Sequence, residues 1–91
     1  MLTLRSIGRQ DYSVREDGQT IGRIRYASER TPGRWLWYVQ VHIPVTNPMG
    51  TADTLDKAKA DFKSAWERFK TQHTPEEFER AYRAMNIRGK D

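Results

Sequence analysis

The polar and hydrophobic positions of WLWYVQVHI, residues 35–43, alternate with a period of two. Successive side chains of a β-strand point to opposite faces, so this pattern predicts a strand with one face in the core. Pro44 is predicted to end the strand, because proline cannot donate a hydrogen bond to a sheet ladder. The odd-numbered positions are all large and apolar and form the predicted core face: Trp35, Trp37, Val39, Val41 and Ile43.

A β-hairpin is predicted for residues 11–27. Two alternating segments, 11–16 and 20–27, flank the dipeptide Asp17-Gly18, which is a common hairpin turn. The length of the loop decides which side chains share a face, because a slip of one residue exchanges the two faces of a strand.

Two registers of this hairpin are open. A two-residue loop places Val14 opposite Ile21, whereas a three-residue loop places Val14 on one face with Gly22 and Ile24. We favour the three-residue loop, because it gathers more apolar side chains on one face; it turns Ile21 outward. Gly22 lies inside the predicted strand, which indicates either a bulge or a large ring packed over the bare backbone.

Residues 54–70 are predicted to form the main helix. Thr54 is the expected N-cap, and apolar residues then recur at intervals of three and four. This stripe is expected to pack on the tryptophan-bearing face of the sheet. Its members are Leu55, Ala58, Phe62, Ala65, Trp66 and Phe69.

A second, shorter helix is predicted over residues 75–86. Thr74 is its expected N-cap, Pro75 its first residue and Glu77 the partner of Thr74 in a capping box. We expect this helix to fold back on the domain, and the alternative is an arm that docks on a partner. Its apolar stripe consists of Phe78, Ala81, Tyr82 and Met85.

Together these elements predict a single α+β domain over residues 1–91. Its core is a three-stranded antiparallel meander packed against one long helix, and a shorter C-terminal helix follows. Residues 1–10 are either an edge strand or a flexible N-terminus, and residues 44–53 are a connection. The predicted strands cover residues 11–16, 20–27 and 35–43.

The composition limits the cellular compartment and the kinds of bonds and sites that the protein can form. The chain has no cysteine, which excludes disulfides and thiolate metal sites and fits a reducing cytoplasm. No run of 18 apolar residues occurs, so we expect no membrane span and no membrane partner.

The sequence offers no pattern typical of an enzyme. His42 and His73 are the two histidines and lie 31 positions apart, without the short ligand spacing of metal sites. Asp53, Asp56 and Asp61 fit acids at the start and on the surface of a helix better than a catalytic pair. We therefore expect a non-enzymatic protein with no metal and no cofactor.

The outward face of the predicted sheet is the candidate site. It combines arginines with aromatic and amide groups, and the chain carries a net charge of +4. Such a face suits nucleic acid, because arginine forks bind phosphate and aromatic rings stack on bases. The predicted contact residues are Arg15, Arg23, Arg25, Tyr38, Gln40 and His42, beside Ser13, Ile21 and Leu36.

The alternative is a protein–protein interaction module with no nucleic-acid role. Tyrosine and arginine are also enriched where protein interfaces are strongest, so the same face would serve a protein partner. The second helix is another candidate docking surface, through Phe78, Tyr82 and Met85. The sequence leaves the oligomeric state open.

Three segments carry a resemblance to known proteins: DYSVREDGQTIGRI, RWLWYVQV and GTADTLDKAKADFKSAW. Across residues 11–66 the chain resembles short uncharacterised bacterial proteins in which an aromatic-rich three-stranded sheet precedes a helix, which implies a fold and no activity. The same order is similar to AP2-type and integrase arm-type DNA-binding domains. That similarity implies DNA contacts from arginines of the exposed sheet, at positions corresponding to Arg15, Arg23 and Arg25.

Overall fold

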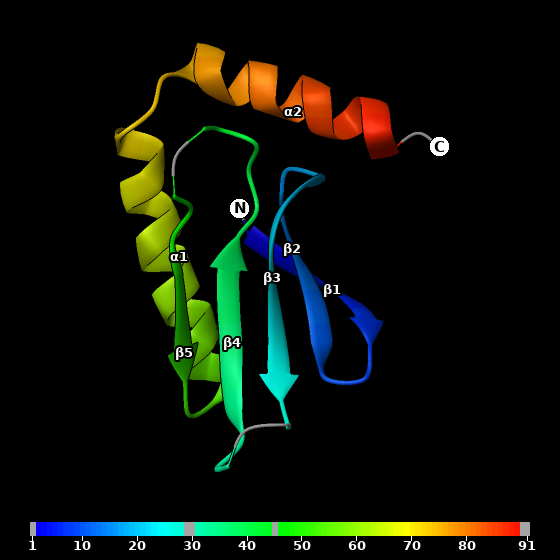
Figure 1. Ribbon diagram of the computed structural model, residues 1–91, viewed down its shortest axis with the longest axis vertical. Coiled ribbons are helices and arrows are strands. Elements are labelled where there is room, and N and C mark those ends of the chain that lie inside the picture. The colour runs from blue at the N-terminus through cyan, green and yellow to red at the C-terminus, as the bar shows by residue number, and fades with distance from the viewer. Residues whose placement is uncertain (1, 29–30, 45, 90–91) are drawn as a thin grey trace.

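The computed structural model describes residues 2–28, 31–44 and 46–89. Within these residues the chain forms five strands followed by two helices (Figure 1). The strands make one antiparallel sheet in the order β1-β2-β3-β4-β5. The predicted α+β class is confirmed, and the prediction of three strands is wrong. The elements are β1 Leu2–Gly8, β2 Asp11–Glu16, β3 Gln19–Ala27, β4 Arg34–Val39, β5 Met49–Ala52, α1 Leu55–Thr71 and α2 Pro75–Gly89.

The two additional strands lie at the edges of the sheet. Residues 1–10 were open between a strand and a flexible segment, and Leu2–Gly8 is a strand that pairs with β2. Residues 44–53 are not only a connection, because Met49–Ala52 pairs with β4. This strand contains a glycine and is too short to show an alternating pattern, so its pairing depends on the edge that β4 offers.

The strand predicted over residues 35–43 ends earlier, at Val39. The chain beyond it is held by other hydrogen bonds: Gln40 N donates to the Ile21 carbonyl at 2.8 Å, and Ile43 N donates to the Val41 carbonyl at 2.8 Å. The odd-numbered side chains nevertheless stay inward, because Val41 and Ile43 are both buried. The predicted parity therefore holds beyond the end of the regular strand.

The β2–β3 hairpin contains a feature of each open register. Glu16 pairs with Gln19, so the loop is the two-residue turn Asp17-Gly18, whose φ angles are 51° and 84°. A bulge then shifts the register by one residue, so Val14 pairs with Gly22 and shares a face with it, which is the grouping that the three-residue loop predicted.

Ile21 is the extra residue of this bulge. The prediction that Ile21 faces outward is wrong, because its side chain is 0% exposed and belongs to the core. Beyond the bulge, Tyr12 lies opposite Ile24 and Ser13 opposite Arg23, so the favoured register is wrong in its residue pairs but right in which side chains share a face.

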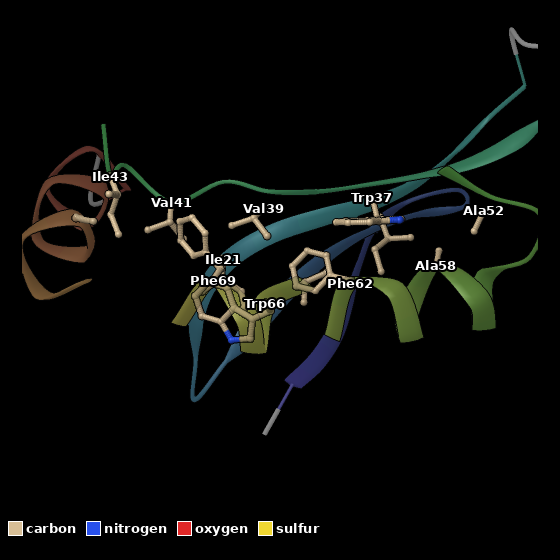
Figure 2. Close-up of a cluster of buried hydrophobic side chains, with 13 residues drawn as sticks. Ile21, Trp37, Val39, Val41, Ile43, Ala52, Ala58, Phe62, Trp66 and Phe69 are labelled. Atoms are coloured by element: carbon tan, nitrogen blue, oxygen red, sulfur yellow. The ribbon is translucent and has the colours of Figure 1, made fainter. Parts of the chain in front are cut away.

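The core lies between the sheet and α1 (Figure 2). Phe62 of α1 is 1% exposed and meets Trp37 edge-on, with 6.1 Å between the ring centroids. The same ring covers Gly22, where an added Cβ would lie 2.5 Å from the ring and 2.5 Å from the Tyr38 carbonyl oxygen. Gly22 therefore combines both features expected of it, a neighbouring bulge and a ring over the backbone.

Both helix starts are confirmed by their hydrogen bonds. Thr54 Oγ1 accepts from Lys57 N at 3.1 Å. At the start of α2, Thr74 Oγ1 accepts from Glu77 N at 3.2 Å, and Glu77 Oε1 accepts from Thr74 N at 2.8 Å, which completes the capping box. The second helix is longer than the predicted 75–86, because it continues to Gly89.

The second helix folds back on the domain and crosses one end of the sheet (Figure 1). Ala81 is 2% exposed, and the Phe78 ring packs against Trp66 and Phe69 with centroid distances of 5.6 and 5.9 Å. Its position leaves the sheet face opposite α1 uncovered.

Candidate contact surface on the outer face of the sheet

The outer face, as we define it, is the sheet face opposite α1. Strand pairing aligns its side chains in rows that run across the sheet. One row spans all five strands and consists of Arg5, Ser13, Arg23, Tyr38 and Met49. The adjacent row consists of Asp11, Arg25, Leu36 and Thr51.

An ion pair anchors the centre of this face. Arg23 Nε donates to Asp11 Oδ1 at 2.8 Å, and Arg23 Nη2 donates to Asp11 Oδ2. The hydrogen bond from Arg23 lowers the pKa of Asp11; burial opposes it, and the positive charges of Arg23 and Arg25 add to it. The same hydrogen bond raises the pKa of Arg23, so the guanidinium is a permanent cation held in one orientation.

The predicted contact residues do not form one site. Arg23, Arg25 and Tyr38 lie together on the outer face. Arg15 donates from Nη2 to the Gly18 carbonyl at 2.6 Å, so it supports the hairpin turn.

Gln40 and His42 lie beyond the end of β4 and are exposed. His42 borders a hollow of about 180 Å³ with Ile43, Pro44 and residues of α2. This hollow lies beside α2. Neither Gln40 nor His42 has a register partner on a neighbouring strand, so neither belongs to the two rows that carry the arginines.

Arg5 is the outer-face residue that sequence reasoning missed. It lies on β1, which had no firm assignment, and it shares a row with Arg23. The alternation of Leu2, Thr3, Leu4 and Arg5 was the available signal, because it places Arg5 on the polar face of an edge strand.

The candidate docking residues of the second helix mostly pack inward. Phe78 and Tyr82 have ring centroids 5.9 Å apart and flank the aromatic core around Trp66. Burial and, next, the negative charge of Glu16 raise the pKa of Tyr82 to about 12. Met85 is half-buried. Phe78 and Tyr82 also line a groove of about 620 Å³ between α2, the end of α1 and the β2–β3 turn.

The Asp11–Arg23 ion pair leads to a pH-dependent stability. Asp11→Asn is expected to lower the free energy of unfolding at neutral pH, and the difference from the parent protein should shrink in acid. The pKa of Asp11 in the folded state lies below the ordinary 3.8. The ion pair therefore contributes its full stabilisation above about pH 3.8, the ordinary pKa. This contribution is lost as the pH falls through the lower pKa of the folded state.

Urea unfolding at several pH values, from neutral down to about 2.5, measures this difference. Glu67→Gln is the control, because it neutralises an exposed α1 carboxylate that makes no ion pair with any described residue. An effect of Asp11→Asn that stays constant over the whole pH range would contradict the ion-pair explanation.

Among the described residues, no three histidine or carboxylate side chains gather in a way that could hold a metal ion. Neither described helix combines the length and apolar character needed to cross a membrane. Comparisons with protein-family models, curated proteins and solved structures find no match. The resemblances to bacterial sheet-and-helix proteins and to DNA-binding domains therefore remain predictions.

Proposed function

We propose that this protein is a small, non-enzymatic nucleic-acid-binding module that uses the outer face of its sheet. The observation that carries the proposal is the cross-strand row with Arg5, Arg23 and Tyr38 in register. Arg25 lies in the next row, beside Leu36. These side chains occupy a face that neither helix covers (Figure 1).

The spacing of the row suits a phosphate backbone. Neighbouring strands lie about 4.8 Å apart, so the backbones at Arg5 and Arg23 are separated by about 10 Å. Arg5 presents a planar fork that matches phosphate oxygens, and Arg23 adds the N–H groups that Asp11 does not occupy. Tyr38 is one strand beyond Arg23 and offers a ring to a base or a sugar.

The ion pair limits the part that Arg23 takes in binding. Asp11 occupies the Nε and Nη2 donors, so Arg23 offers a phosphate only its remaining N–H groups. The net charge of +4 steers polyanions toward the protein without specifying where they bind. Guanidinium, phenol and apolar side chains make up most of the outer face, and these are groups suited to binding, which supports a non-enzymatic role.

A protein partner on the same face is the second candidate. Met49 is 73% exposed at the end of the arginine row, and Leu36 is half-buried in the adjacent row. Methionine, tyrosine and arginine are enriched in protein interfaces. This candidate predicts an association that depends on apolar contact and responds weakly to salt.

Fluorescence anisotropy with labelled single-stranded DNA, duplex DNA and RNA tests the proposal. Oligonucleotides of about 16 nucleotides cover one site of this kind. We expect binding that weakens steeply between about 50 and 200 mM salt. Arg5→Gln with Arg25→Gln should weaken it about tenfold and reduce the slope of log K against log salt by about 2, because each lost phosphate contact reduces the slope by about 1.

Arg68→Gln on α1 is the control for charge alone, because it removes one arginine charge outside the outer face. It should change the affinity only slightly. Equal losses from the control and from the double variant would overturn the assignment of the outer face. No binding to any of the three nucleic acids at low salt would overturn the nucleic-acid function. A salt-insensitive protein association that Met49→Glu abolishes would establish the second candidate in its place.

A further inference from the structure

We propose that β1 and the groove beside it bind an extended acidic segment of a partner protein, which joins the sheet as an additional strand. This site shares β1 with the nucleic-acid surface but uses the main-chain edge of the strand and the face toward α1, whereas Arg5 lies on the outer face. Three features of the described residues support it: an open strand edge, an apolar groove along that edge and lysines at the rim of the groove.

The edge is open over most of β1. Leu2–Gly8 pairs with β2 on one side, and no strand in the described part of the chain pairs with the other. Between Leu2 and Ser6 the pairing is regular, and the bulge lies only at Ser6/Gly8. Proteins commonly protect such edges with inward charges or prolines, but the inward residues here are Leu2 and Leu4.

The groove follows from how α1 lies on the sheet. The helix packs against β4 and β5, at the opposite edge, so the inner face beside β1 is only partly covered. Leu2 and Leu4 consequently remain half-exposed. They line a groove of about 160 Å³ together with Val14, Ile24 and Phe62.

A strand added beside β1 would complete this groove. Alternate side chains of a strand point to the same face, so every second side chain of the added segment would reach the apolar surface around Leu2 and Leu4. Main-chain hydrogen bonds to β1 would supply affinity, and the groove would select apolar side chains at alternate positions.

The charges at the rim indicate an acidic partner. Lys59 and Lys63 are one helical turn apart on α1, and both border the groove. Lys59 has only a long contact to Asp56, at 3.8 Å, and Lys63 has no ion-pair partner among the residues that the structure describes. Carboxylates flanking the apolar residues of the segment would pair with these lysines.

The same charges disfavour a second copy of this chain as the occupant. Antiparallel pairing of two β1 strands about a two-fold axis would place both α1 helices on the same face of the joined sheet. Lys59 and Lys63 of each copy would then converge on the shared edge, where like charges repel. A partner segment with carboxylates has no such conflict.

The test is a titration of the ¹⁵N-labelled protein with the acetylated peptide Glu-Thr-Val-Thr-Ile-Thr-Glu, in which both glutamates share a face with the apolar residues, followed by NMR. We expect shifts in the β1 amides and in Lys59 and Lys63. The double variant Lys59→Glu/Lys63→Glu should bind about tenfold more weakly, because two charge pairs are reversed. It should regain affinity for the same peptide with lysine in place of glutamate. Lys57→Glu, on the same helix but outside the groove, is the matched control and should bind like the parent protein.

Two N-methylated peptides, one methylated at odd and one at even positions, separate strand addition from side-chain binding alone. We expect one of the two to lose binding, because the N–H groups of a strand point alternately toward and away from its neighbour. Unchanged binding of both methylated peptides, or no shifts in β1 with the original one, would overturn the proposal. Concentration-dependent dimerisation with shifts confined to β1, in the absence of peptide, would overturn it in favour of self-association.

Discussion

Replacing Phe62 by alanine is expected to lower the free energy of unfolding by about 3–5 kcal/mol. The side chain is 1% exposed and fills the space between α1 and the sheet, against Trp37 and Gly22. Alanine would leave a cavity that the surrounding rings cannot close without moving the helix. Domains of this size have a total stability of about 5–15 kcal/mol, so the variant should be close to unfolding.

Urea denaturation followed by tryptophan fluorescence measures the effect. Phe62→Leu is the matched variant, because it keeps most of the apolar volume and should be destabilised by less than about 1.5 kcal/mol. If alanine and leucine had the same small effect, the packing of α1 over Trp37 would be contradicted.

Gly22→Ala is the second substitution with a large expected effect. It should lower the free energy of unfolding by about 1–3 kcal/mol. An alanine within a strand is ordinarily more stable than a glycine, because glycine loses more backbone entropy on folding. At Gly22 the sign reverses, since the added Cβ would lie 2.5 Å from the Phe62 ring and 2.5 Å from the Tyr38 carbonyl oxygen. The oxygen belongs to the backbone of β4, so the clash requires the two strands to separate.

Gly8→Ala is the control for this substitution, because a Cβ there meets nothing closer than 3.7 Å. We expect its stability to change by less than about 0.5 kcal/mol. In the double variant Gly22→Ala/Phe62→Ala the loss should be smaller than the sum of the single losses, because the ring that the Cβ strikes is gone. A neutral Gly22→Ala would show that the hairpin and α1 are not packed as closely as described.

Local sequence patterns were sufficient to predict features that depend only on residues within the same element. The alternation of residues 35–43 placed Trp37 and Val39 inward and Tyr38 outward, and burial confirms each of them. The hydroxyls of Thr54 and Thr74 marked both helix starts, because a cap depends only on the next few residues. The arginines of β3 were placed on the correct face although the predicted three-residue loop does not form, because the bulge at Ile21 restores the same grouping by face.

Local sequence patterns did not predict features that depend on pairing with another strand. Residues 49–52 have no strand signal of their own, and β4 makes them a strand. Ile21 turns inward because the bulge rotates it toward the core, which the turn residues alone do not indicate.

By itself, then, the sequence determined the α+β class, both helix starts and the alternation that buries Trp37 and Val39 and exposes Tyr38, whereas the bulge in the hairpin decided the face of Arg23 and Arg25. Only the tertiary structure decided the number of strands, the Asp11–Arg23 ion pair, the place of Arg5 in the arginine row and the groove beside β1. The physical reason is that helix caps and side-chain alternation depend on neighbours within a few residues. Strand pairing, ion pairs between strands and grooves depend on segments that meet only after the chain has folded.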